Sequence, residues 1–260
     1  MLTYPQLSSG AITHFPVRKR RVTRTITNTT LDGRAIKLAD PGAETTQWQL
    51  QYSALSDEEL SMLQQFFSAA EGTLNTFLFL DPTDNLLAWS GQLDQAVWEC
   101  APFLSLSSDI SDLAGGTAAW TLTNSSSAAQ SIQQTLNAPA GYVYCFSAYA
   151  RCNQPVTVTM LRGTDRFDRA VGPGWSRLVV SGASAPADSI SFGLELPGNA
   201  TIDVYGLQVE PQTFPSAYKP TQATTGVYAD ARLRDDLFSF TTTDVNRHSC
   251  AVNIIHANHL

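Results

Sequence analysis

Charge is scarce in this sequence, and its scarcity bears on the possible partners. Only 15% of the 260 residues are charged, and the net charge is −7. Binding to nucleic acid or to an anionic membrane surface normally needs an excess of positive charge. We therefore expect no sequence-specific nucleic acid partner and no attraction to membranes. The 43% of hydrophobic residues is typical of a folded globular protein.

Long apolar segments are also missing. No run of about 18 apolar residues occurs, which is the length that a membrane-spanning helix needs. The first 21 residues contain no apolar stretch behind a basic start, so the sequence predicts neither a secretory signal nor membrane insertion.

Cysteine is rare, and the cysteines are not spaced as metal ligands usually are. The four cysteines are Cys100, Cys145, Cys152 and Cys250, and no two are in a CxxC arrangement. This spacing fits neither a zinc site nor a thioredoxin-like site. We expect free thiols in a protein made in the cytoplasm, with a Cys145–Cys152 disulfide as the alternative.

Catalytic motifs are absent as well. The sequence has no GxSxG, no HExxH and no glycine-rich phosphate loop. Asp165 and Asp168 lie three residues apart, but the arginines beside them would pair both acids, whereas a glycosidase needs two carboxyl groups in different environments. We expect no catalytic residue, no metal ligand, no cofactor and no enzymatic activity. Calcium bound by Asp and backbone oxygens stays open.

What is present begins with a small α+β pattern. Residues 46–54 alternate between apolar and polar side chains, which predicts a half-buried strand. Asp32-Gly33 predicts a hairpin before it. Ser56 and Glu59 form a capping box at the start of a helix that Gly72 can close. Phe77–Leu80 follows as an unbroken apolar strand.

A different pattern runs from about residue 85 to residue 221. Short strand-like runs alternate with Gly, Pro, Asn and Ser clusters, and no helix is predicted. This spacing is typical of a β-sandwich of the jelly-roll type. Pro211, Pro215 and Pro220 remove backbone donors, so the segment after Glu210 should leave its sheet as an extended tail.

These patterns predict a mainly β fold of two domains. A small, β-rich α+β domain with one helix, residues 1–84 plus 223–260, is interrupted by a jelly-roll sandwich at residues 85–222. Insertion into an exposed loop is tolerated because the ends of a compact domain often lie close together.

The sandwich segment resembles the carbohydrate-binding-module-like sandwiches of phage tail proteins and of extracellular glycan-active enzymes. The resemblance covers about half of the chain. Its carriers, in chain order, are Asn85–Leu87, Trp89-Ser90, Trp98, Asp112–Ala118, Gln130–Gln134, Gly141-Tyr142, Phe146–Arg151, Trp175–Arg177, Ser181-Gly182, Gly206–Glu210 and Phe214–Thr221.

The outer segments resemble the phage distal tail or minor tail protein family. The carriers are Gln47–Ser53, Leu55–Glu59, Leu63–Phe67, Glu71-Gly72 and Thr76–Pro82. The resemblance implies a subunit of a six-fold ring that joins the tail tube to the tip or baseplate of a virion. It implies tail tube, tail hub and tape-measure proteins as partners. The long insertion departs from the single-domain form of that family.

Exposed aromatic rings are the candidate carbohydrate-binding groups, because the C–H faces of sugars stack on them. Tyr149 and Arg151 share a strand face, and Glu195 points outward from a later strand, so we expect the three to line one open sheet. Trp98 and Trp175 are further candidates. Packing in the core or at its rim is the alternative for each ring.

A basic cluster near the N-terminus provides candidates for a subunit interface. They are Arg18, Lys19, Arg20, Arg21 and Arg24. Phosphate contact with DNA is the alternative, but no aromatic residues interleave the cluster, and acidic residues balance the domain. Pairing with carboxylates of a neighbouring subunit would explain it.

The sequence therefore predicts a non-enzymatic component of a phage or phage-like tail tip. It would form a homo-oligomeric ring, with a peripheral sandwich that binds host surface polysaccharide. The alternative is a free-standing carbohydrate-binding or glycan-processing protein.

Overall fold

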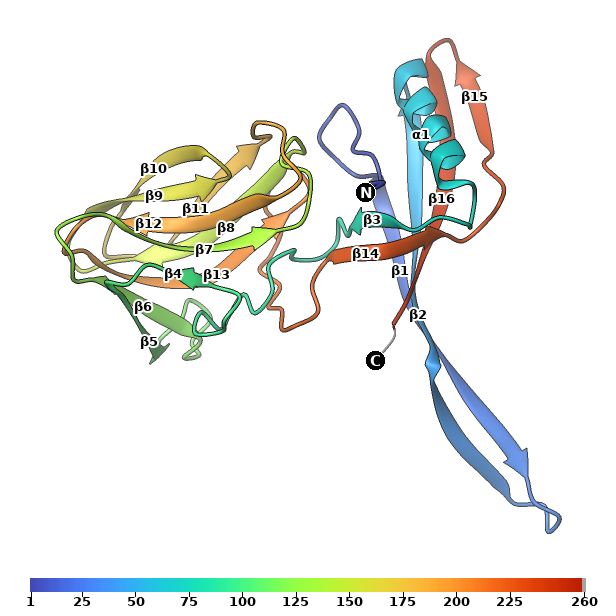
Figure 1. The fold of residues 1–260 in the computed structure, drawn as a ribbon, viewed down its shortest axis with the longest axis horizontal. Helices are drawn as coiled ribbons and strands as arrows, with labels where there is room; N and C mark the ends of the chain where they lie inside the picture. The colour runs from blue at the N-terminus through green and yellow to red at the C-terminus, as the bar shows by residue number, and fades with distance from the viewer. Residues whose placement is uncertain (259–260) are drawn as a thin grey trace. The chain divides into compact units, whose positions relative to one another are not determined.

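The chain folds into two compact units, shown in a computed structural model that describes residues 1–258 (Figure 1). Unit 1 comprises Met1–Ser8, Ile12–Phe79 and the described residues from Tyr228 onward, and unit 2 comprises Ser9–Ala11 and Leu80–Val227. The predicted bounds of the inserted sandwich, residues 85 and 222, each lie five residues inside the bounds of unit 2 at Leu80 and Val227. No pattern in the sequence indicates that Ser9–Ala11 belongs to unit 2.

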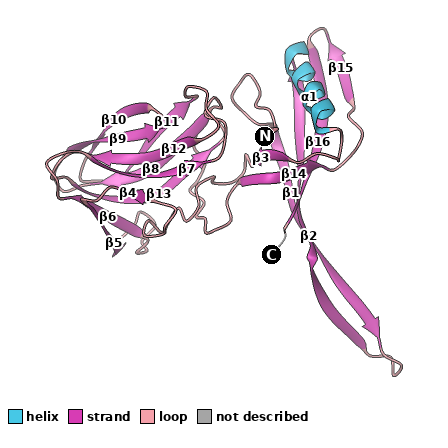
Figure 2. Ribbon diagram, in the orientation of Figure 1, coloured by secondary structure: helices cyan, strands magenta, loops and turns pink. Residues whose placement is uncertain are grey.

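The fold is mainly β with one helix among the described residues, as the sequence predicts (Figure 2). That helix has 14 residues. Within residues 1–258, no helix is long and apolar enough to cross a membrane. The four cysteines are free thiols, so the alternative of a Cys145–Cys152 disulfide is wrong in this structure.

Unit 1 is built on a six-stranded sheet of order β1-β2-β16-β14-β3, with β15 paired to β16. Its elements are β1 (His14–Thr29), β2 (Ala35–Leu55), α1 (Asp57–Ala70), β3 (Phe77–Leu80), β14 (Val227–Leu233), β15 (Phe240–Asp244) and β16 (Arg247–Ala257). Trp48, Leu50 and Tyr52 are buried on one face of β2, which is the face that the alternation predicts.

Helix α1 begins where the sequence places it. Ser56 is the N-cap, and the reciprocal capping box with Glu59 is present. The helix ends in the left-handed region at Glu71 (φ 51°), one residue before the predicted Gly72, which also has a positive φ of 63°. Leu60, Leu63 and Phe66 are buried, so the helix lays its apolar face on unit 1.

Strands β1 and β2 extend far beyond the rest of unit 1 as a two-stranded hairpin arm, here defined as residues 22–40 (Figure 1). The turn at its tip is longer than a two-residue hairpin, since β1 ends at Thr29 and β2 starts at Ala35. The backbone N–H of Thr30 donates to the carbonyl oxygen of Arg34 at 2.9 Å, and Gly33 supplies a positive φ of 83°.

Unit 2 is a sandwich of two antiparallel five-stranded sheets. The first sheet has the order β10-β9-β12-β7-β4 and the second has the order β11-β8-β13-β6-β5. The strands are β4 (Glu99–Cys100), β5 (Leu104–Ile110), β6 (Ala119–Asn124), β7 (Gln130–Leu136), β8 (Tyr144–Arg151), β9 (Val156–Arg162), β10 (Asp165–Val171), β11 (Ser176–Gly182), β12 (Ile190–Leu196) and β13 (Thr201–Glu210).

The two sheets meet through aromatic rings. Tyr144 and Phe146 of β8 pack on Phe192 of β12, with ring centroids 5.4 and 5.8 Å apart. All three rings are fully buried. Because strand side chains alternate, burying these residues turns Tyr149 and Arg151 of β8 to the outside of the second sheet.

Candidate functional site

The outer face of the second sheet carries two cross-strand rows of aromatic and charged side chains. In the first row, Arg177 of β11 lies opposite Tyr149 of β8, which lies opposite Tyr205 of β13. In the second row, Arg151 lies opposite Asp203, and Trp175 precedes β11 on the other side of Arg151. The register of three neighbouring strands thus brings residues from three chain segments together. We name this surface the aromatic–arginine face, and it includes Tyr218.

Rings and guanidinium groups contact one another along these rows. The Tyr205 ring centroid lies 6.1 Å from that of Tyr149 and 6.5 Å from that of Trp175. The guanidinium carbon of Arg151 lies 4.6 Å from the Trp175 ring centroid, and that of Arg177 lies 5.2 Å from the Tyr149 ring centroid. Both distances are within the range of cation–π attraction. The contacts hold the rings in place on an open sheet.

A hydrogen-bonded ion pair fixes the second row. Arg151 Nε donates to Asp203 Oδ2 at 2.9 Å, and Arg151 Nη2 donates to Ser111 Oγ at 3.1 Å. Thr121 Oγ1 donates to the other oxygen of Asp203 at 2.6 Å. All four side chains come from different segments, so the carboxylate and the guanidinium have defined orientations.

The segment after β13 folds back over part of the same sheet. It leaves the sheet after Glu210, as its prolines predict. The fully buried Glu210 carboxylate accepts hydrogen bonds from the Ser216 backbone N–H at 2.8 Å and from Lys219 Nζ at 3.2 Å. The backbone N–H of Lys219 donates to Gln208 Oε1 at 2.7 Å. These bonds fasten residues 211–221, here called the tail, to the sheet.

The tail adds a fourth ring to the face. Tyr218 lies 5.2 Å from Tyr205 between ring centroids, and its hydroxyl is hydrogen-bonded to that of Ser90 at 3.1 Å. Gly206 makes room for this ring, because a Cβ atom there would lie 3.1 Å from Tyr218 and 3.3 Å from Tyr149. Its φ of 66° is also one that side chains other than glycine rarely adopt.

Burial affects the ionisation of these tyrosines. Desolvation raises the pKa of Tyr218 above its ordinary value, against the opposing effect of its hydrogen bond with Ser90. Desolvation likewise raises the pKa of Tyr205, helped by the negative charge of Asp112. Both hydroxyls therefore stay protonated at neutral pH and can donate hydrogen bonds to a ligand.

Two donors on the face have no partner within residues 1–258. They are the indole Nε1–H of Trp175 and the Nε–H of Arg177, and both nitrogen atoms are buried. An unpaired buried donor costs about 1–3 kcal/mol. A polar ligand or ordered water that reached these groups would recover that energy.

The structure brings together three of the five residues proposed as carbohydrate candidates, namely Tyr149, Arg151 and Trp175. The expectation that Glu195 shares their sheet is wrong, because Glu195 lies on β12 in the first sheet and pairs with Arg166. Trp98 is only 5% exposed, and its indole donates to the carbonyl oxygen of Trp89 at 3.1 Å. Trp98 therefore packs in unit 2 and offers no stacking surface.

Sequence reasoning missed Asp203, Tyr205, Arg177 and Tyr218. A signal for the first two was present, because Ile202 and Val204 are core residues and the alternation turns their neighbours outward. Arg177 could be placed only with the β8–β11 register, and Tyr218 only with the path of the tail.

Among the described residues, no group of three or more His, Cys, Asp or Glu side chains could hold a metal ion. The Asp112 carboxylate near the face accepts backbone N–H groups instead, from Ala118, Gly116 and Ala114 at 2.7–3.0 Å. The Ala118 hydrogen bond in particular lowers the pKa of Asp112.

The members of the basic cluster of unit 1 differ in the groups that they contact. Arg21 pairs with Glu44 and Arg24 with Asp40 within the chain, and a subunit interface at these arginines stays a prediction. Lys19 lies over the Trp48 and Tyr228 rings at 5.7 and 6.0 Å. Arg18 and Arg20 have no ion pair or hydrogen bond from their side chains within the described chain.

Comparison with known proteins leaves the family open. No protein-family model matches the chain, and no curated protein matches it. Among solved structures, a CBM22-1 xylan-binding domain of Xyn10C from Paenibacillus barcinonensis matches at a TM-score of 0.42 and 15% identity, over 50% of this chain and 96% of that chain. TmCBM61 in complex with β-1,4-galactotriose matches at 0.40 and 15%, over 48% and 97%.

The enzymatically active domain of tailspike protein 4 from bacteriophage CBA120 also matches, at a TM-score of 0.40 and 15% identity, over 50% of this chain and 22% of that chain. With TM-scores below 0.5, these similarities do not assign the chain to a family. The resemblance to distal tail proteins stays a prediction.

Proposed function

We propose that unit 2 is a non-catalytic saccharide-binding module and that the aromatic–arginine face is its binding surface. The observation that carries this proposal is the cross-strand arrangement of Tyr149, Tyr205 and Trp175 beside Arg151 and Asp203. Flat rings offer stacking surfaces to the C–H faces of sugars, while the guanidinium and carboxylate groups are suited to hydroxyl groups. The combination suits a neutral or acidic polysaccharide.

The alternative surface, the outer face of the first sheet, has a different chemistry. Its side chains pair mainly among themselves, for example Thr135 with Ser191 and Asp168 with Thr159. The exposed rings therefore favour the second sheet as the saccharide-binding surface. Variants on the first sheet serve as controls for the binding experiment.

Binding should be tested on soluble polysaccharides, including purified bacterial surface polysaccharides, by affinity electrophoresis and then calorimetry. The change Tyr205→Ala should weaken binding about tenfold or more, the size expected when a central aromatic contact is lost. Arg151→Ala should weaken it as well. The matched control is Arg166→Ala, which also breaks an arginine–carboxylate pair but on the first sheet. Equal losses in all three variants would contradict the proposal.

Turnover is not part of the proposed function. Hydrolysis of a glycosidic bond normally requires a carboxylic acid that can give up a proton near neutral pH. Asp112, next to Tyr205, has a lowered pKa, which is the opposite of what a general acid needs. We expect no release of reducing sugar from any polysaccharide that binds, and sustained release would contradict a purely binding role.

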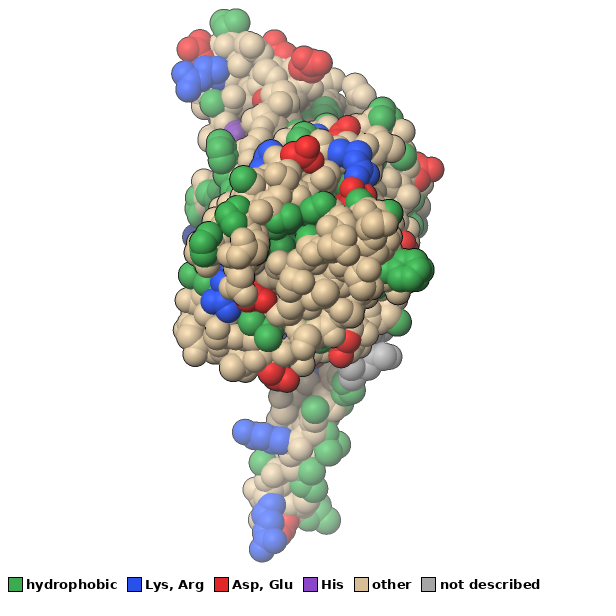
Figure 3. All heavy atoms as spheres, turned by 90° about the vertical axis from the view of Figure 1, so that its left-hand side faces the viewer, with side chains coloured by type: hydrophobic (Ala, Val, Ile, Leu, Met, Phe, Trp, Pro, Cys, Tyr) green, Lys and Arg blue, Asp and Glu red, His purple; other side chains and the backbone are tan. Residues whose placement is uncertain are grey.

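A second role, subunit of an assembly, is favoured by the hairpin arm of unit 1. No strand within residues 1–258 pairs with the arm as a third strand, and an isolated two-stranded hairpin is marginally stable in water. Val22, Ile26, Ile36 and Leu38 are 40–50% exposed. Figure 3 shows hydrophobic side chains mostly along one side of the arm and basic side chains mostly along the other.

We therefore also propose that the chain self-associates through the arm, and the predicted phage tail-tip ring is the most specific form of this proposal. Ile26 lies directly opposite Leu38, so Ile26→Asp with Leu38→Asp should abolish the oligomer. Thr25→Asp with Ala39→Asp changes a cross-strand pair on the other face and should preserve it. Mass by light scattering with negative-stain images checks this. A wild-type monomer at all concentrations would contradict self-association.

A further inference from the structure

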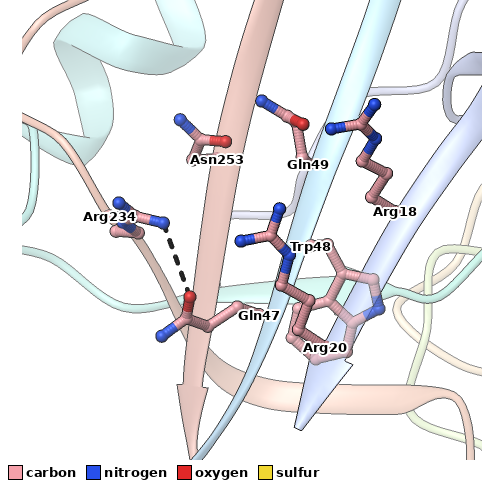
Figure 4. Close-up of a pocket in the computed structure, with 7 residues that line it drawn as sticks. All are labelled: Arg18, Arg20, Gln47, Trp48, Gln49, Arg234 and Asn253. Carbon is pink, nitrogen blue, oxygen red and sulfur yellow. Dashed lines mark hydrogen bonds between the residues drawn. The ribbon is translucent and has the colours of Figure 1, made fainter. Parts of the chain in front are cut away.

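A small basic pocket lies on unit 1, on the opposite side of the sheet from the buried side chains of Leu50 and Tyr52. Three adjacent strands, β1, β2 and β16, and the residue that follows β14 contribute to it. One row of its residues runs Arg18, Gln49, Asn253 and then Arg234. Figure 4 shows Arg20 and Gln47 in the neighbouring row, with the Trp48 ring behind Arg20. Its volume is about 40 Å³.

No lining residue of the pocket neutralises its positive charge. Three guanidinium groups line it, from Arg18, Arg20 and Arg234, and no carboxylate of the described chain does. The Asp235 carboxylate contacts two of the lining residues, since its Oδ1 is 4.0 Å from Arg234 Nε and its Oδ2 accepts from Asn253 Nδ2 at 2.8 Å. One partly engaged carboxylate is too little for three cations.

Other arginines of β1 and of the turn at the tip of the arm are paired with carboxylates. Arg21 and Arg24 of β1 and Arg34 of the turn before β2 each have a carboxylate partner. Arg18 and Arg20 differ from these neighbours, since neither side chain has a hydrogen-bond or ion-pair partner within residues 1–258. Gathering three like charges costs free energy unless a counter-charge joins them.

The pocket has the donor arrangement of an oxyanion receptor. Guanidinium groups present planar pairs of N–H donors that match the oxygens of carboxylate and phosphate. The Gln47 amide oxygen accepts from Arg234 Nη1 at 3.4 Å, which orients that guanidinium beside the pocket. A volume of about 40 Å³ can hold a few water molecules, since one needs roughly 10–15 Å³ of such space. One carboxylate or phosphate group could take their place.

We propose that Arg18, Arg20 and Arg234 form a binding site for an oxyanion. The ligand is either a free small anion, such as phosphate, or a carboxylate side chain on a second copy of the chain. The two sources share one chemistry, and the experiment distinguishes them. This site is independent of the saccharide face in unit 2.

The test is calorimetric titration of the full-length protein with inorganic phosphate at constant ionic strength. One saturable site per chain is expected. Arg18→Gln with Arg20→Gln should lower the affinity at least about tenfold, because a hydrogen bond to a charged group contributes about 1.5–3 kcal/mol. Arg234→Gln, on a different strand, should also lower it.

The matched control is Arg34→Gln with Arg247→Gln, which removes the same charge from exposed sites of unit 1 and should change the affinity less than twofold. Light scattering in phosphate and in chloride then identifies the source. A fall in oligomer mass in phosphate means that phosphate displaces a carboxylate of a second copy, whereas an unchanged mass means a free anion. Absence of saturable binding, or equal losses in both double variants, would overturn the proposal.

Discussion

The two outer faces of unit 2 are made by sheets of the same size and strand direction, yet they differ in chemistry. The first sheet presents short polar side chains and the exposed Arg166–Glu195 pair. The second presents three rings, two guanidinium groups and a tail that covers part of its surface. A sheet needs only its inner face to form the core, so the outer face is where two similar sheets can acquire different functions.

The largest difference should appear between the two glutamates. Glu210 is fully buried, whereas the Glu195 side chain is 20% exposed. Glu210→Ala should cost about 3 kcal/mol or more in unfolding free energy, because it leaves Lys219 and the tail without their charged partner. Glu195→Ala breaks an exposed pair and should cost about 1 kcal/mol or less. Urea unfolding of both variants measures the difference. Similar losses of unfolding free energy would contradict the claim that the buried Glu210 carboxylate stabilises the tail.

A smaller effect is expected at Gly206, where Tyr149 and Tyr218 meet. Gly206→Ala places a Cβ atom against both rings at a φ of 66°, and we expect a cost of about 1–2 kcal/mol. Because the added atom displaces rings of the face, saccharide binding should fall too. Gly141→Ala is the control, since a Cβ there meets nothing within 4 Å. Full binding by a folded Gly206→Ala protein would show that ring placement is not required.

Which side chains of a strand point outward follows from local sequence. Which strands share a sheet does not. Alternation in β8 places Tyr149 and Arg151 outward because Tyr144 and Phe146 are core residues. The assignment of Glu195 to the same sheet failed because alternation gives the face of a strand and not the sheet to which the strand belongs. β12 pairs with β7 and β9, and that depends on contacts between distant segments.

Burial of individual rings was equally hard to predict. Trp98 and Trp175 look alike in the sequence, yet one indole donates to a backbone carbonyl within unit 2 and the other stacks on a guanidinium at the surface. In unit 1, the capping box of α1 was predictable because all of its contacts are local. The proposed anion pocket was not, because its row of residues crosses β1, β2 and β16 and ends just after β14.

The smallest expected effect is on pH dependence. The pKa values of Tyr205 and Tyr218 are raised in the folded protein, so their contribution to stability is complete below the unfolded pKa near 10 and is lost as the pH rises through the folded values. Wild type should therefore lose more stability above pH 10 than Tyr205→Phe with Tyr218→Phe. Unfolding of both proteins at pH 9 and pH 11 checks this, and equal losses would contradict it.

The most direct test is to map a bound saccharide by nuclear magnetic resonance on the isotope-labelled protein. The account predicts shifts at Tyr149, Arg151 and Tyr205 and at the indole N–H of Trp175, whose nitrogen has no partner among the described residues. Signals of Ser191 and Glu195 on the first sheet should not move. Shifts confined to the first sheet would contradict the claim that the aromatic–arginine face is the binding surface.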